Sequence, residues 1–174
     1  MYAKIIKYSS PVGDIWLEEK NGAISRVYLP CVGANIVRPP NINDVEHTGK
    51  QLSNITGEQC SPLLENARTQ FEEYFNGARR VFDLPLNFDG CTDFMLRVYR
   101  ELMKVKYGET ASYKDIAERV GSPKAYRAVG LANNKNPLAI IVPCHRIVGS
   151  DGGLVGYAGG LELKSRLLEL ERKN

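Results

Sequence analysis

Alternation of apolar and polar residues dominates the first thirty positions of the chain. Three short segments rich in β-forming residues, 2–8, 14–17 and 23–29, are separated by turn-forming residues such as Asn21-Gly22. A period of two is typical of strands with one buried face, and Asn-Gly is a common hairpin turn. The pattern therefore predicts a small antiparallel meander.

Residues 31–60 are rich in Asn, Pro, Gly and Thr and show no sustained period. We expect irregular surface structure or a poorly ordered connection there. From Ser61 onward the apolar residues recur at helical spacing. Ser61 is suited to capping a helix, Pro62 to its first turn, and Asn76-Gly77 to its end.

The segment Asp83 to Gly90, which contains Pro85, is interpreted as a link between two domains. A helix with one buried stripe is expected after it, over about 92–105. The fold class is therefore predicted as α/β, of the α+β type. A small αβ domain with antiparallel strands would span 1–88, and a mainly helical domain would span 89–174.

Capping residues predict a pair of short helices in the second domain. Ser112 and Asp115 have approximately the spacing of a capping box, and Gly121 is a plausible stop. Ser122 then caps again, with Pro123 at the first helical position. The pair is interpreted as a helix-turn-helix with a very tight turn, a motif that often binds DNA but is also often only structural.

The second helix of this pair is expected to have one apolar face and one face made mostly of small residues. Ala125, Ala128, Val129 and Ala132 would form the apolar face. On the other face, with Gly130 and Asn134, the only long side chain is that of Arg127. Small residues let a helix approach a duplex closely, and one long cation can then reach into a vacated base position. The alternative is an ordinary exposed arginine.

Charge is unevenly distributed along the chain, although the formal net charge is only +3. Residues 104–146 hold 8 Lys and Arg against 3 Asp and Glu. Such a surplus suits a polyanionic partner such as nucleic acid. A solvated lysine-rich surface would explain the same counts.

The apolar run Leu138 to Val142, interpreted as a buried strand, leads directly into Pro143-Cys144-His145-Arg146. A thiol reacts as the thiolate, and an adjacent His and Arg favour that form. Cys144 is therefore a candidate nucleophile, and an inert core cysteine is the alternative. The glycine-rich segment 149–160 that follows is interpreted as a mobile hairpin or wing.

A last helix is expected from about Leu161, and Glu171 lies on its largely apolar face. A carboxylate there needs a buried partner. His145 is the candidate and Lys164 a possible competitor. A solvated carboxylate near a fraying end is the alternative.

Cysteine spacing and hydropathy exclude several classes of protein. The four cysteines show no C-x-x-C pair and the chain has two histidines, so neither a zinc site nor a disulfide framework is indicated. No apolar stretch approaches the ~20 residues that span a bilayer, and the N-terminus lacks a signal-peptide core. We expect a cytoplasmic protein without a membrane partner.

The chain from Phe94 to Glu171 resembles the O6-alkylguanine-DNA alkyltransferases, also called methylated-DNA–protein-cysteine methyltransferases. The segments that carry the resemblance are Tyr107-Gly108-Glu109-Thr110, Ser112-Tyr113, Arg127-Ala128-Val129-Gly130, Asn136-Pro137, Pro143-Cys144-His145-Arg146 and Gly156-Tyr157-Ala158-Gly159-Gly160. The N-terminal part is similar to the family only in length and in the segment 82–86. The resemblance implies a monomeric DNA-repair protein that acts once on O6-alkylguanine in double-stranded DNA.

In this resemblance five residues have catalytic roles. Cys144 would accept the alkyl group, and His145, acting through a water, would remove the thiol proton. Glu171 would hold the imidazole in the required tautomer. Tyr113 would donate toward the guanine as it leaves, and Asn136 would brace the turn next to the nucleophile.

The resemblance also implies a DNA-binding set around a flipped base, because O6 of a stacked guanine is inaccessible to a buried sulfur. Arg127 would fill the gap, and Gly130 would allow the close approach of its helix. Contacts to the DNA backbone and to the base are implied for Lys114, Ser122, Ser150, Tyr157 and Ala158. Only the backbone amide of Ala158 could serve the alkylated oxygen.

No cofactor is implied, and no structural metal is expected because the N-terminal half lacks the Cys/His set that some relatives use for zinc. Two other functions remain open at this point. An alkyltransferase-like protein would bind the lesion without transferring the group, although such proteins lack the cysteine of this motif. A thiol hydrolase would use Cys144, His145 and Glu171 as a triad, and would leave the basic segment without a role.

Overall fold

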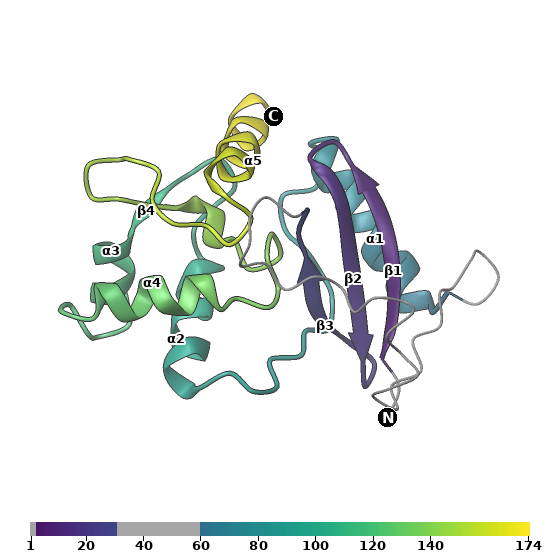
Figure 1. The fold of residues 1–174 in the computed structure, drawn as a ribbon, viewed down its shortest axis with the longest axis horizontal. Coiled ribbons are helices and arrows are strands. Elements are labelled where there is room, and N and C mark those ends of the chain that lie inside the picture. The colour runs from purple at the N-terminus through teal and green to yellow at the C-terminus, as the bar shows by residue number, and fades with distance from the viewer. Residues whose placement is uncertain (1–2, 31–59) are drawn as a thin grey trace.

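The N-terminal part of the protein is a three-stranded antiparallel sheet. The computed structural model describes residues 3–30 and 60–174, so the expectation for 31–60 lies outside the described residues except at Cys60. Strands β1 (Lys4–Ser10), β2 (Gly13–Lys20) and β3 (Ala23–Tyr28) pair in the order β1-β2-β3. The predicted meander is therefore confirmed over the described residues (Figure 1).

Helix α1 (Pro62–Phe75) covers one face of this sheet (Figure 1). As predicted, Ser61 caps it: the hydroxyl accepts a hydrogen bond from the Leu64 amide at 3.2 Å. Phe71 and Tyr74 of the helix are fully buried in the core that the helix shares with the sheet. Burying such large aromatic side chains is a main source of stability in a small sheet–helix layer.

The outer edge of β3 joins the sheet to the rest of the chain. The amide of Ile24 donates to the carbonyl of Pro85, and the amide of Val27 donates to the carbonyl of Pro137, both at 2.8 Å. The predicted link 83–90 is thus also an edge segment of the sheet. The same edge fixes the segment that leads into the candidate nucleophile.

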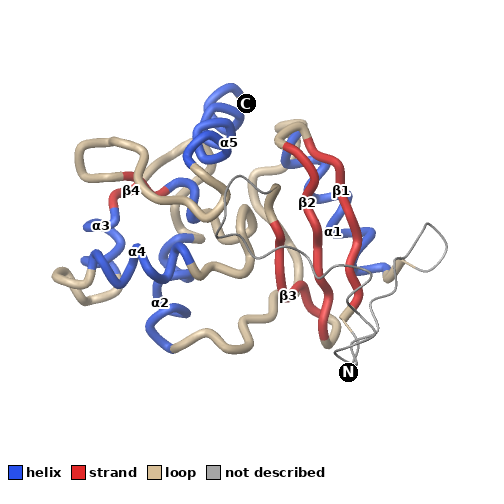
Figure 2. Tube along the Cα trace, in the orientation of Figure 1, coloured by secondary structure: helices blue, strands red, loops and turns tan. Residues whose placement is uncertain are grey.

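After residue 90 the longer regular elements are helices, joined by turns and loops (Figure 2). They are α2 (Asp93–Leu102), α3 (Tyr113–Arg119), α4 (Tyr126–Asn134) and α5 (Leu161–Lys173). The capping box of α3 is confirmed, because Ser112 and Asp115 each accept a hydrogen bond from the other's backbone amide. Gly121, at φ +73°, reverses the chain after α3 as predicted.

The start of α4 was wrongly predicted. Ser122 does not cap it; the carbonyl of Ser122 instead accepts the amide of Ala125 at 2.8 Å and closes a separate turn. The helix begins at Tyr126 with no side-chain cap, so the two helices are not joined by a very tight turn. Ala128 was also misplaced, because it is exposed while Val129, Ala132 and Asn133 form the buried face.

The apolar run 138–142 is buried, but it is not a strand. The amide of Val142 donates back to the carbonyl of Leu138 at 2.8 Å, and Ile140 has a positive φ of 73°. The run is therefore a compact turn that bridges β3 only at Leu138. The short strands β4 (Ala111–Ser112) and β5 (Ile147–Val148) pair in parallel. No strand forms within the glycine-rich segment 149–160, so the interpretation of this segment as a hairpin is wrong.

Buried side chains of both halves form one continuous core. The division into domains 1–88 and 89–174 is therefore not visible as two separate cores, and it stays a prediction. None of the helices in the described part of the chain has the length and apolar character needed to cross a membrane.

Candidate active site and nucleic-acid interface

Cys144 begins a 3-10 turn (Cys144–Arg146) in the middle of the molecule and is 4% exposed. The side chain of Asn136 holds the approach to this turn. Its Nδ2 donates to the Val142 carbonyl at 2.9 Å and to the Cys144 Sγ at 3.1 Å, while its Oδ1 accepts the Leu138 amide at 3.0 Å. One amide therefore fixes both the turn and the sulfur.

Burial raises the pKa of the Cys144 thiol, and the hydrogen bond from Asn136 only partly opposes this effect. The sulfur therefore rests as a thiol and needs a base. The expectation that Arg146 favours the thiolate is wrong. Its guanidinium donates to Glu171 and to the Val105 carbonyl instead of facing the sulfur.

His145 lies next to the sulfur in the chain and is fully buried. Its Nε2 lies 2.8 Å from Glu171 Oε1, whereas its Nδ1 is buried and has no hydrogen-bond partner among the described residues. Burial lowers the pKa of His145 despite the adjacent carboxylate, so the ring is neutral near pH 7. A neutral ring that donates through Nε2 leaves the Nδ1 lone pair available to accept a proton.

Glu171 is buried, which excludes the solvated carboxylate as an interpretation. Its two oxygens accept from Arg146 Nε and Nη2, both at 2.9 Å, from the Tyr74 hydroxyl at 2.7 Å, and from the Gly108 amide at 3.1 Å. Burial alone would raise the pKa of this carboxyl, but the hydrogen bonds from His145 and Arg146 and the positive charge of Arg146 outweigh it and hold the pKa far below its usual value. The carboxylate is therefore a fixed negative charge.

Gly108 is required at this point for two reasons. Its φ is +77°, and a Cβ there would lie 3.1 Å from the backbone oxygen of Glu171. A side chain would therefore be strained and would push α5 away from the amide that binds the carboxylate.

Lys164 does not compete for Glu171. Its ammonium donates to the carbonyls of Ile147 and Val155, at 2.5 and 2.7 Å. Burial lowers the pKa of Lys164 to about 8. From the sequence we expected Lys164 only as a possible competitor for Glu171. The signal for a buried role was its position on the apolar face of the last helix.

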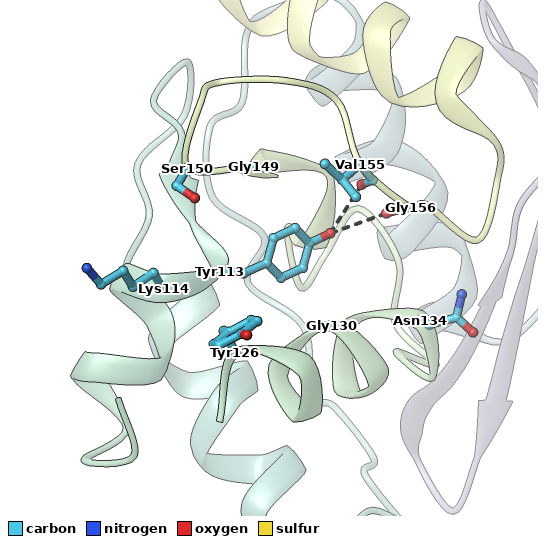
Figure 3. A pocket seen from close by; sticks show the side chains of 9 residues that line it. All are labelled: Tyr113, Lys114, Tyr126, Gly130, Asn134, Gly149, Ser150, Val155 and Gly156. Carbon is cyan, nitrogen blue, oxygen red and sulfur yellow. Dashed lines mark hydrogen bonds between the residues drawn. The ribbon is translucent and has the colours of Figure 1, made fainter. Parts of the chain in front are cut away.

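A cavity of about 450 Å³ lies between α3, α4 and the segment 149–156, and Cys144 is not among the residues that line it. Its lining includes four of the expected residues, Tyr113, Lys114, Gly130 and Ser150 (Figure 3). The hydroxyl of Tyr113 points toward the 149–156 segment and donates to the carbonyls of Val155 and Gly156, at 3.2 and 3.3 Å.

Two lining or neighbouring residues were missed by the sequence analysis. Tyr126 lines the cavity and is 47% exposed at the start of α4. Asn133 is 6% exposed, and neither polar atom of its amide has a partner among the described residues. The exposure of an aromatic side chain and the lack of partners for a buried amide can be recognised only once the structure shows which residues are buried.

The other expected DNA-binding residues lie around this cavity without being part of its lining. Arg127 is exposed, with its guanidinium carbon 5.9 Å from the centre of the Tyr126 ring. Tyr157 is half-buried, and its hydroxyl is buried without a partner in the described ranges. Ala158 is exposed and Ser122 half-exposed.

Among residues 3–30 and 60–174, no three His, Cys, Asp or Glu side chains cluster as a metal site would require. Cys31 and His47 lie outside these ranges. The absence of a structural metal stays a prediction.

Comparison with known proteins finds similarity to methylated-DNA–protein-cysteine methyltransferases, in agreement with the geometry of the site. A sequence model described as "6-O-methylguanine DNA methyltransferase, DNA binding domain" matches residues 93–173. A methylated-DNA–protein-cysteine methyltransferase of Methanosarcina barkeri is 56% identical over 112 residues, which cover 64% of this chain and 70% of that protein. The constitutive one of Bacillus subtilis is 41% identical over 164 residues, covering 94% of this chain and 92% of the relative.

Solved structures extend this similarity to the N-terminal half. The crystal structure of the Mycobacterium tuberculosis O6-methylguanine methyltransferase matches with a TM-score of 0.78 at 36% identity, over 98% of this chain and 93% of that one. A structure of the M. tuberculosis protein in complex with DNA matches equally well. The architecture is therefore shared over nearly the whole chain.

Proposed function

Because the chain belongs to the O6-methylguanine-DNA methyltransferase family, we propose that it repairs DNA by moving the alkyl group of O6-alkylguanine onto Cys144. One observation supports this most directly. Asn136 holds the sulfur of Cys144 beside a buried His145 whose Nε2 is bound by Glu171 and whose Nδ1 is unoccupied. The arrangement supplies a nucleophile, a base and an orienting carboxylate.

In the proposed reaction His145 takes the thiol proton at Nδ1, directly or through one water. The sulfur then attacks the alkyl carbon, the carbon–O6 bond breaks, and the electron pair of that bond stays on the guanine oxygen. A proton returned to the purine, for which the Tyr113 hydroxyl is the candidate donor, completes the exchange. Glu171 keeps its negative charge throughout and stabilises the imidazolium that forms.

The product is a thioether at Cys144. Breaking a carbon–sulfur bond requires another strong nucleophile. Around Cys144 lie the neutral His145, the hydrogen-bonded Glu171 and Lys164, whose nitrogen is held by the carbonyls of Ile147 and Val155, and none of them is free to attack the thioether. We therefore propose a single turnover for each protein molecule.

Access to O6 requires that the damaged nucleotide leave the base stack. The cavity beside Tyr113 is the proposed place for the extruded base, and Arg127 on the exposed side of α4 is proposed to fill the gap in the duplex. Lys114, Ser122 and Ser150 are proposed to contact the phosphates. Gly130 supports this arrangement because its missing side chain leaves room next to the Tyr113 ring.

We also propose that the protein acts as a monomer in the cytoplasm. Cys60 and Cys91 are unpaired thiols, as is Cys144, and a reducing compartment keeps such thiols from oxidising. Light scattering on the purified protein, alone and with a short duplex, measures the molar mass and should give that of a single chain and of a single chain on the duplex.

The test of the function is a transfer assay with a duplex carrying one O6-methylguanine. Mass spectrometry should find one added methyl group on the peptide that contains Cys144, and restored guanine in the DNA. Cys144→Ser should abolish transfer, whereas Cys91→Ser, the matched change of a half-buried thiol, should not. Binding of the lesion with an unmodified Cys144 peptide would contradict the proposal.

A further inference from the structure

We propose that Tyr74, on α1 in the N-terminal half, is a positioning residue of the transfer reaction, because its hydroxyl holds the carboxylate that orients His145. The inference rests on the proposed function of Cys144 and His145. It gives the N-terminal half a part in the chemistry beyond folding.

Tyr74 reaches the centre of the site from a position 97 residues away in the chain. Its hydroxyl donates to Glu171 Oε1 at 2.7 Å, and it is fully buried. The same oxygen lies 2.8 Å from His145 Nε2 and accepts Arg146 Nη2 at 2.9 Å. Three donors therefore converge on the one oxygen that also sets the orientation of the imidazole.

The ring of Tyr74 is held firmly enough to direct its hydroxyl. It packs edge-on against Tyr107, with centroids 5.8 Å apart, and against Phe75 at 5.2 Å, and it lies 5.4 Å from Phe82. Burial first, and then the charge of Glu171, keep the pKa of Tyr74 well above its ordinary value. The hydroxyl is therefore a donor throughout the physiological pH range.

A donor to a carboxylate withdraws part of its negative charge from its other partners. Without the Tyr74 hydroxyl, Oε1 would attract the His145 proton more strongly and would favour the imidazolium. The other titratable or charged groups around the pair are Arg146, Lys164, Tyr107, Tyr157 and Cys144. Arg146 and Lys164 disfavour the imidazolium, and both are still present in a variant that lacks only the Tyr74 hydroxyl.

Tyr74→Phe is the informative variant, because it removes the hydroxyl and keeps the packing of the ring. Tyr28→Phe is its matched control. The buried Tyr28 donates to Glu18 Oε2 at 2.8 Å, also in the N-terminal half but with no contact to His145. Both variants lose one Tyr–Glu hydrogen bond and should lose similar thermal stability.

The first readout is the protonation of His145, which is monitored across the pH range by nitrogen-15 NMR of the imidazole. The chain has only two histidines, His47 and His145, so a His47→Gln background assigns the signal. We expect the pKa of His145 to be higher in Tyr74→Phe than in wild type by about half a pH unit or more, since a hydrogen bond to a charged group is worth that much. Tyr28→Phe should leave it unchanged.

The second readout is the pH dependence of methyl transfer to Cys144. In Tyr74→Phe the fall in rate on the acid side should move to higher pH by the same amount, while Tyr28→Phe should follow wild type. An unchanged His145 titration together with an unchanged acid limb would overturn the role of Tyr74. Failure of the wild-type protein to transfer methyl at any pH would instead contradict the proposed function, and the NMR titration would still decide the Tyr74–Glu171–His145 coupling.

Discussion

Arg146 and Glu171, which lie 25 residues apart, form a buried bidentate ion pair with both nitrogen–oxygen distances at 2.9 Å. The pair fastens the reactive turn to α5 (Leu161–Lys173) at its C-terminal turn. Burial is the main reason why His145 stays neutral beside a carboxylate, and the positive charge of the guanidinium adds to it.

Glu171→Gln should therefore be strongly destabilising. It leaves the Arg146 guanidinium buried without its counter-charge, which costs about 3–5 kcal/mol in the free energy of unfolding. Urea denaturation measures this cost. Glu169→Gln, an exposed change on the same helix, is the control and should lie within about 0.5 kcal/mol of wild type. Equal stability of the two variants would contradict the structural role of the pair.

Stability should decrease as the pH falls below 6.5. The pKa of His145 is below its ordinary value of 6.5 in the folded protein, so the unfolded chain takes up a proton that the folded one refuses. Glu171, whose folded pKa is depressed, adds a loss below its ordinary value of 4.5. Urea unfolding at a series of pH values measures both effects. In His145→Gln the free energy of unfolding should fall less between pH 6.5 and pH 4.5 than it does in wild type. The same pH dependence in the variant and in wild type would contradict a neutral His145 in the folded protein.

Asn136→Ala should make the Cys144 thiol less reactive. The Asn136 hydrogen bond lowers the pKa of this thiol, so its removal should raise the pKa further and reduce the rate of alkylation about tenfold. Alkylation by iodoacetamide at a fixed, mildly alkaline pH, followed at the Cys144 peptide, measures this change.

Asn87→Ala is the control for that experiment. The Asn87 Oδ1 accepts the amide two residues later, that of Asp89, at 2.7 Å, which repeats the turn that Asn136 forms with Leu138, but it does not contact the sulfur. Its Cys144 peptide should react as in wild type. Equal rates for Asn136→Ala and Asn87→Ala would show that Asn136 does not act on the sulfur.

Arg127→Ala should separate base extrusion from chemistry. If Arg127 fills the vacated position in the duplex, its loss should slow transfer from double-stranded DNA by about tenfold or more, because unstacking costs a few kcal/mol. Transfer from the free base O6-methylguanine should not change. Arg100→Ala, an exposed change on α2 (Asp93–Leu102), serves as control. A loss of equal size on the free base would place Arg127 in the chemistry instead.

The sequence alone determined the features that depend on a few neighbouring residues, such as helix ends, strand periodicity and short motifs. The caps at Ser61 and Ser112 and the stop at Gly121 were predicted because a helix end is decided by the few residues around it. The meander was predicted because a period of two reports a half-buried strand directly. The family resemblance was found for a similar reason, since each of the six segments that carry it, the one around Cys144 included, is a short run of contiguous residues.

The conformation of 138–142 and the partners of the site were decided only by the tertiary structure. Apolar residues predict burial, but the amide of Asn136 closes this run into a turn where a strand would have needed a neighbour. The Arg146 guanidinium donates to Glu171 and to the Val105 carbonyl, partners that come from distant parts of the chain. Tyr74 joins the site through a contact between residues 97 positions apart, and no local pattern in the chain encodes that distance.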